Sequence, residues 1–63
     1  MPLITDPNIP DTDGFYAELL AAHRGLSEDQ AAAMQARLVL ILANHIGDRA
    51  VLSEALRLAR NTG

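Results

Sequence analysis

The sequence contains no cysteine and no tryptophan, and its only aromatic residues are Phe15 and Tyr16. Without cysteine the chain forms neither a disulfide nor a thiolate zinc site. No segment shows the alternation of apolar and polar residues that a half-buried strand requires. The abundance of alanine and leucine is instead typical of helices, so the sequence predicts an all-α protein.

Two further absences limit the class of partner. The formal net charge is -3 and there is no basic tail, so nucleic acid is not an expected partner. No apolar run approaches the roughly 18 to 20 residues that span a bilayer, and the N-terminus lacks the basic and then apolar layout of a signal peptide. We therefore expect a cytoplasmic protein that does not bind the membrane.

The length of 63 residues allows one domain, near the lower limit at which a single core supports a fold. Ordering the chain costs about 1.5 kcal/mol per residue, and burial of apolar surface must offset almost all of that cost. We therefore expect a thin margin of stability that a partner would increase.

The chain divides into two parts. Residues 1-10, MPLITDPNIP, contain all three prolines, each of which removes a backbone donor and favours extended backbone in the residue before it. This segment is predicted to be a proline-rich extended N-terminal arm, and the sequence leaves open whether the arm is docked or disordered. Residues 11-63 are predicted to form a small three-helix domain, with helices at about 11-24, 28-46 and 49-60.

Residues that cap helices stand at the predicted boundaries. Asp11, Thr12 and Asp13 supply an N-cap and an acidic first turn for the first helix, and Ser27 and Asp48 are the expected N-caps of the other two. Glycines suited to left-handed backbone end the first two helices at Gly25 and Gly47. Ser27 and Gln30 also have the spacing of a capping box, in which each side chain bonds to the other residue's backbone N–H.

Each helix is expected to bury one apolar face. These faces are Phe15, Tyr16, Leu19, Leu20 and His23 in the first helix, Ala31, Met34, Leu38, Ile41, Leu42 and His45 in the second, and Val51, Leu52, Ala55, Leu56 and Ala59 in the third. The second helix has another apolar stripe, spaced by four and three and rich in small residues, which lets another backbone approach closely. We call it the small-residue seam, and it comprises Ala32, Ala36, Val39, Ala43 and Ile46.

The second helix is therefore apolar on more sides than its two neighbours can cover. If four large side chains stay half exposed, the lost burial is about 4 kcal/mol, which is comparable with the whole stability of so small a domain. The missing cover is the N-terminal arm, a second copy of the chain or a different protein. The sequence leaves these three alternatives open.

The polar residues give no catalytic arrangement. Ser27 is explained as a cap, Ser53 has no base nearby, and there is no glycine-rich phosphate loop. A chain of this length also has too little bulk to build a cleft. We predict no catalytic residue, no cofactor-binding residue and no metal ligand, and therefore no enzyme activity.

Several polar residues are expected to gather where the first helix begins and the second ends. They are Asp11, Thr12, Asp13, Asn44, His45, Asp48 and Arg49. A histidine and two carboxylates are suitable ligands for a divalent cation. Capping of helix ends explains the same residues without a metal and is the interpretation that we favour.

Three stretches together resemble a known family: ITDPNIPD at 4-11, FYAELLAAH at 15-23 and ARLVLILANHIGDRAVLSEAL at 36-56. The chain resembles a family of very short bacterial proteins of unknown function, often encoded beside an FAD-dependent aromatic-ring hydroxylase. It is also similar to the small coupling subunit of two-component hydroxyphenylacetate hydroxylases, whose large subunit is the flavoprotein.

This resemblance implies a non-catalytic accessory protein that binds a flavoprotein monooxygenase and supports coupled hydroxylation of a phenolic acid. The FAD would belong to the partner, and this chain would bind no cofactor. The seam would be the surface that the partner covers, next to a polar patch formed by TDPNIPD and ANHIGD. The residues expected to contact the partner are Asp6, Asn8, Ala32, Ala36, Val39, Ala43, Asn44, His45, Ile46 and Asp48. The alternative function is a structural or regulatory homodimer that pairs two copies of the second helix through the seam.

Overall fold

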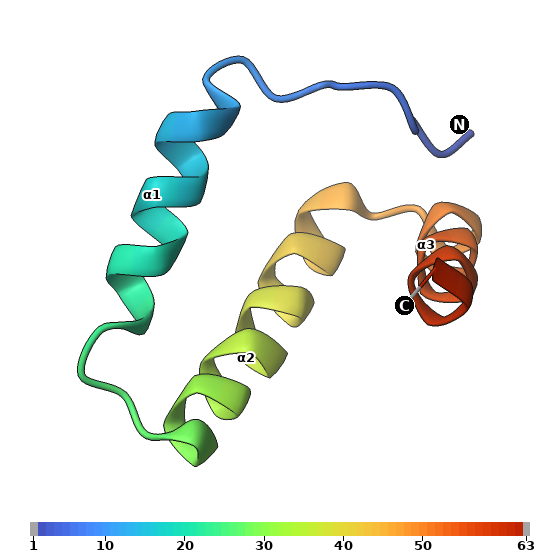
Figure 1. The fold of residues 1–63 in the computed structure, drawn as a ribbon. Coiled ribbons are helices and arrows are strands. Elements are labelled where there is room, and N and C mark those ends of the chain that lie inside the picture. Colours follow the sequence, from blue (N-terminus) through green and yellow to red (C-terminus); the bar gives the residue numbers. More distant parts are fainter. Residues whose placement is uncertain (1, 63) are drawn as a thin grey trace.

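The computed structural model describes residues 2–62, and within that range it contains three α-helices and no strand. The helices are α1 (Thr12–His23), α2 (Glu28–Ile46) and α3 (Arg49–Thr62), as Figure 1 shows. The predicted all-α class with three helices is confirmed. The third helix continues past Arg60, where the sequence predicted its end, to Thr62.

Side chains cap the beginnings of the first two helices as their residue types predict. The Asp11 carboxylate accepts a hydrogen bond from the Gly14 N–H at 3.1 Å. At the start of α2, Ser27 Oγ accepts from the Gln30 N–H at 3.2 Å, while Gln30 Oε1 accepts from the Ser27 N–H at 3.0 Å. Both bonds of the capping box are present, so backbone donors without an intrahelical partner are satisfied locally.

Left-handed glycines follow α1 and α2. Gly25 has φ +78°, and Gly47 has φ +67° and donates its N–H to the Ala43 carbonyl at 3.0 Å. A side chain in this conformation costs about 1 to 2 kcal/mol, which explains why glycine stands here.

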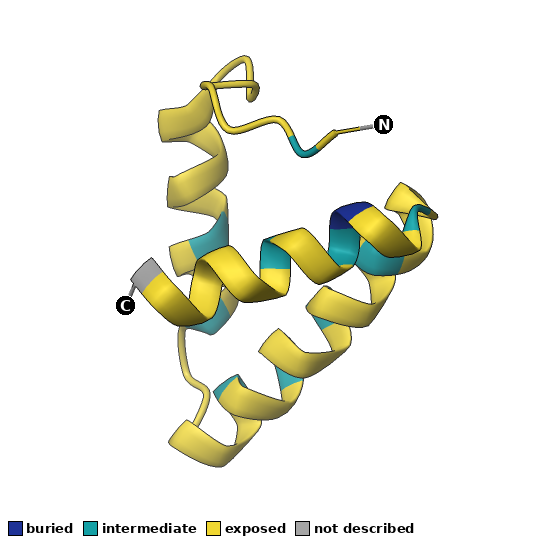
Figure 2. Ribbon diagram, turned by 90° about the vertical axis from the view of Figure 1, so that its right-hand side faces the viewer, coloured by how far each residue is buried: buried dark blue, intermediate teal, exposed yellow. Residues whose placement is uncertain are grey.

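The three helices form an open arrangement. α1 and α2 run in opposite directions on either side of the connection 24–27 (Figure 1), and in Figure 2 they diverge away from that connection. α3 lies at a steep angle to α2 and is seen almost end-on in Figure 1. Among residues 2–62, no two helices pack closely along their length.

The overall dimensions confirm this openness. The radius of gyration is 13.3 Å, whereas a compact domain of this length has about 11 Å. The accessible surface is 5623 Å², whereas a compact monomer of the same mass exposes about 4,000 Å². The chain therefore exposes about 1,600 Å² more than a compact protein of its size.

Almost no side chain is fully enclosed. Val51 at the start of α3 is 6% exposed and is the one buried residue among those that the structure describes, as Figure 2 shows. The large apolar side chains that remain exposed are Ile4, Ile9, Phe15, Tyr16, Leu20, Leu26, Val39, Leu40, Ile41, Leu42, Ile46, Leu56 and Leu58. The chain by itself has no core of the usual kind.

Several predicted burials are therefore wrong. In the face of α1 only Leu19 and His23 are half-buried, while Phe15, Tyr16 and Leu20 are exposed. The core stripe of α2 is half-buried only near its beginning, and Ile41 is 65% exposed. Leu56 of α3, predicted to face inward, is 67% exposed. The physical reason is that the helices diverge, so that each apolar face meets a neighbour along a short part of its length.

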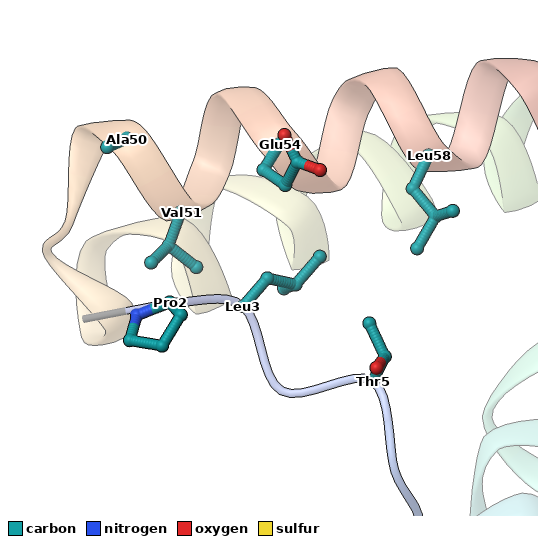
Figure 3. Close-up of a pocket in the computed structure, with 7 residues that line it drawn as sticks. All are labelled: Pro2, Leu3, Thr5, Ala50, Val51, Glu54 and Leu58. Atoms are coloured by element: carbon teal, nitrogen blue, oxygen red, sulfur yellow. The ribbon is translucent and has the colours of Figure 1, made fainter.

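Residues 2–11 contain neither helix nor strand, and the first part of this segment lies against α3. Figure 3 shows the half-buried Leu3 side chain directed at α3 near Val51. Between segment and helix is an open groove of about 420 Å³, lined by Pro2, Leu3, Thr5, Ala50, Val51, Glu54 and Leu58. These N-terminal residues therefore cover part of α3 and leave the exposed sides of α2 uncovered.

The capping box of α2 gives a direct prediction. Replacing Ser27 by alanine removes the acceptor for the Gln30 N–H and should lower the free energy of unfolding by about 1 kcal/mol. Urea denaturation followed by circular dichroism measures this change. The matched control is Ser53→Ala, because Ser53 is an exposed serine inside α3 whose Oγ accepts only an exposed hydrogen bond from Arg49. Equal effects of the two substitutions would contradict the role assigned to Ser27.

Candidate functional site

The beginning of α2 is partly covered by the end of α1 and by the connection between the two helices. Ala31, Met34 and Leu38, at helical spacing, are half-buried on this side of α2. A shallow groove lies beside them, lined by Ala22, Leu26, Gln30, Ala33, Met34 and Arg37. This is the closed end of the α1 and α2 pair.

His23 links α1 to α2 at the closed end. His23 Nδ1 lies 2.8 Å from the Leu19 carbonyl oxygen, and His23 Nε2 lies 3.0 Å from Gln35 Nε2. In this arrangement Nδ1 donates to the carbonyl and Nε2 accepts from the Gln35 amide. The ring connects α1 to α2 across the intervening turn.

In the second half of α2 every residue except Leu38 and Ala43 is exposed. Val39, Leu40, Ile41 and Leu42 follow one another around the helix axis, and the most exposed of them, Leu40, reaches 70%. Four successive residues at about 100° per residue point in four different directions. No single face of another helix of this chain can therefore cover the run.

From helical spacing we infer that one apolar face of α1 and one of α2 are directed at the space between these diverging helices. On α1 the side chains share the face of Leu19 and His23, and on α2 they continue the stripe of Met34 and Leu38 beyond its half-buried part. We call this surface the open V face, and it comprises Phe15, Tyr16, Leu20, Ile41 and Leu42, all exposed. It contains no charged residue and both aromatic residues of the chain.

The small-residue seam lies on another side of α2. Ala32, Ala36 and Ile46 are exposed and Val39 is 58% exposed, while Ala43, near the start of α3, is half-buried. From the N-terminal segment, Pro2, Leu3 and Thr5 line a groove together with residues of α3. The seam is therefore apolar surface that the described part of the chain leaves open.

The polar residues predicted to contact a partner are spread over three places. Asp6 and Asn8 are exposed in the N-terminal segment, and Asn44 and His45 are exposed in the last turn of α2. Asp48 is half-buried between α2 and α3 and caps α3.

Two of the acidic residues that the sequence predicted to gather near His45, Asp11 and Asp48, serve as caps. Asp11 accepts from Gly14, and the Asp48 carboxylate accepts from the N–H groups of Ala50 at 3.0 Å and Val51 at 3.1 Å. Within residues 2–62 no group of three or more histidine, aspartate and glutamate side chains is placed to hold a metal ion. The geometry thus agrees with the capping interpretation of these acids.

The sequence matches the family described as "Protein of unknown function (DUF2783)" over residues 3–61. The chain belongs to this family. The match includes the N-terminal segment from Leu3, all of α1 and α2, and α3 as far as Asn61. No curated protein and no solved structure matches the chain. Within the described range, no helix of this DUF2783 member has both the length and the apolar character needed to cross a bilayer.

Sequence reasoning missed three features of this DUF2783 member's surface. Leu40 belongs to neither predicted stripe of α2, although it is the most exposed of the large apolar side chains. The hydrogen bond between Gln35 and His23 was not predicted, because a single side-chain contact across a turn leaves no periodic pattern in the sequence. Leu58 was outside the predicted face of α3, yet it lines the groove with Leu3. Only the unbroken apolar run from Leu38 to Ala43 signalled the exposure of Leu40.

The Asp48 cap makes stability depend on pH. The hydrogen bond from the Val51 N–H, with a smaller effect of the Ala50 N–H, lowers the pKa of the Asp48 carboxyl below its ordinary value of 3.8. Because the folded pKa is the lower one, the stabilising contribution is complete above pH 3.8 and is lost as the pH falls through the folded pKa. In thermal unfolding, the wild type should therefore lose this stabilising contribution in the acid range, whereas Asp48→Asn should not.

The Asp48→Asn variant is the appropriate comparison in that experiment, because an asparagine oxygen accepts the same hydrogen bonds but does not titrate. The measured quantity is the difference in Tm between wild type and variant from about pH 6 to about pH 2.5. A difference that stays constant over this range would show that the Asp48 carboxylate contributes nothing through its charge.

Proposed function

We propose that this chain is a non-catalytic accessory protein that binds an FAD-dependent aromatic-ring hydroxylase and supports coupled hydroxylation of a phenolic acid. The binding role rests on one observation, the exposure of four consecutive large apolar side chains in α2, from Val39 to Leu42. Val39, Leu40 and Ile41 are each more than half exposed, whereas large aliphatic side chains gain about 1.5 to 3 kcal/mol from full burial. This surface favours association with another protein.

The exposed surface also has the size of an interface. A standard protein–protein interface takes about 800 Å² from each partner. The surplus exposure of this chain is about 1,600 Å², twice that amount. The chain therefore offers enough uncovered surface for a stable complex without unfolding any helix.

The non-catalytic part of the proposal is supported by the hydrogen bonds of the potential nucleophiles. Ser27 Oγ accepts from the Gln30 N–H, and Ser53 Oγ accepts from the Arg49 guanidinium. Neither of these bonds comes from a histidine, so neither serine has the base that activates a hydroxyl nucleophile. His23 is engaged between Leu19 and Gln35.

The identity of the partner rests on the resemblance of residues 4-11, 15-23 and 36-56 to the coupling subunit of two-component hydroxylases. All three stretches lie inside the range matched by the family. The third stretch contains most of the seam, namely Ala36, Val39, Ala43 and Ile46. We assign the seam to the hydroxylase because its small side chains allow a partner backbone to approach closely.

The proposed action is indirect. A helical protein docked on a flavoprotein can order a loop over the active site and exclude water from it. Exclusion of water favours transfer of oxygen to the phenolic substrate and reduces wasteful release of peroxide. The FAD, the substrate and the reacting atoms all belong to the hydroxylase.

The test is co-expression with the FAD-dependent aromatic hydroxylase of the same genome, followed by affinity capture and measurement of peroxide release. Wild-type protein should be captured and should lower the peroxide formed for each reduced nicotinamide consumed. Val39→Glu should weaken capture at least about tenfold, because a buried unpaired carboxylate costs more than the roughly 1.4 kcal/mol that this factor represents.

The control is Leu56→Glu, which places the same charge at a similarly exposed leucine on α3, away from the seam. It should be captured like the wild type. Absence of a complex, together with unchanged peroxide release when the protein is added, would refute the proposed function.

A further inference from the structure

We propose that the open V face binds a second copy of this chain, so that two α1 and α2 pairs form a four-helix bundle around a two-fold axis. This inference goes beyond the proposed function and uses a different surface. The hydroxylase is assigned to the seam of α2, and the second copy to Phe15, Tyr16, Leu20, Ile41 and Leu42.

The first argument is the shape of the surface. α1 and α2 are tied at their closed end by the His23 to Gln35 hydrogen bond and diverge from there (Figure 2). The half-buried residues Leu19, Met34 and Leu38 lie toward that end. Of the exposed V-face residues, Leu20 lies beside Leu19, and the other four, Phe15, Tyr16, Ile41 and Leu42, lie farther from the closed end. A further helix inserted between the diverging helices would continue the partial burial already present.

The second argument is self-complementarity. In a two-fold dimer, if residue i of one copy contacts residue j of the other, then residue j of the first copy contacts residue i of the second. One surface must therefore supply both halves of the contact. The V face has aromatic side chains on α1 and aliphatic side chains on α2. Insertion of α1 of one copy into the V of the other therefore places Phe15 and Tyr16 against Ile41 and Leu42 twice. Such helix pairs with short connections pack as four-helix bundles.

The third argument is composition. The cores of homodimer interfaces are depleted of charge and enriched in aromatic residues and large apolar residues. None of the five side chains of the V face is charged, and the only phenylalanine and the only tyrosine of the chain both lie in it. No charged group of the V face would be desolvated in this contact.

The fourth argument is area and availability. Val51 is the one buried residue among those that the structure describes. The exposed apolar side chains of this chain would therefore require a partner as soon as the chain folds. Obligate homodimers often have no stable folded monomer. A second copy is present wherever the first is made, and two-fold dimers are the commonest soluble oligomers. The surplus of about 1,600 Å² per chain accommodates one standard interface for the second copy and one for the hydroxylase.

Tyr16 reports on this contact in the unmodified protein. It is 59% exposed in a single chain, and with no tryptophan present its emission is not obscured. The experiment combines analytical ultracentrifugation with acrylamide quenching of Tyr16 in the purified chain alone. We expect twice the mass of one chain, and quenching of Tyr16 several times weaker than that of free tyrosine amide.

Two variants of α2 locate the surface. Ile41→Glu should abolish the dimer and most of the helical signal, because it places a carboxylate in the core of the bundle. Leu40→Glu is the matched control, because Leu40 has an exposure of 70% against 65% for Ile41. Around the axis of α2, Leu40 lies about 100° from Ile41 on the side away from Leu42, and about 160° from Leu42, so it lies outside the V face. Leu40→Glu should remain helical and dimeric with Tyr16 protected.

Three outcomes would overturn the proposal: a folded monomer, a chain that is unfolded until the hydroxylase is added, or a dimer in which Tyr16 is quenched like the free amide. The outcome for the hydroxylase is separable from these. Val39→Glu should still dimerise while losing capture, and a dimer that captures no hydroxylase would refute only the proposed function.

Discussion

Hydrogen bonds at the helix ends, and not packing between helices, define the shape of this chain. The capping box of Ser27 and Gln30 and the carboxylates of Asp11 and Asp48 satisfy backbone donors at the starts of the helices. Caps fix where a helix begins, but each contributes only about 1 kcal/mol. Isolated helices of about 12 residues are marginal in water, so most helical stability in proteins comes from burial of an apolar face. The rest of the structure therefore depends on a cover that the chain itself does not provide.

The two uncovered sides of α2 differ in what they can receive. The V face is walled by α1 and carries large side chains, which suits insertion of a helix with a complementary large face. The seam has small side chains and no wall, which suits close approach along a flatter surface. α2 thus serves as a shared element on which two separate contacts can be built. A helix that is apolar on every side is usually buried in a protein interior. With both proposed contacts made, α2 would also be buried.

The sequence predicted the parts of this structure that are determined locally. Ser27, Gln30, Gly47 and Asp48 act within a few residues of themselves, so their types and spacing predict the helix boundaries closely. The buried faces were predicted less well, because burial depends on how helices are placed relative to one another. Leu56 illustrates this. Its spacing from Leu52 suits a face directed at the other helices, but Leu56 is exposed in the structure. The side of α3 that is covered is the one at Val51, beside the N-terminal segment. For the candidate site, the seam followed from periodicity, whereas the V face depends on the divergence of α1 from α2.

The exposed run from Val39 to Leu42 has a consequence for the lifetime of the chain in the cell. Quality control continuously removes proteins that present apolar segments, and small differences in the covered fraction change abundance severalfold. A single copy displays this run to proteases and chaperones, whereas the proposed complexes would conceal it. Turnover would then adjust the amount of this protein to the number of complexes that it can enter, without any dedicated regulator.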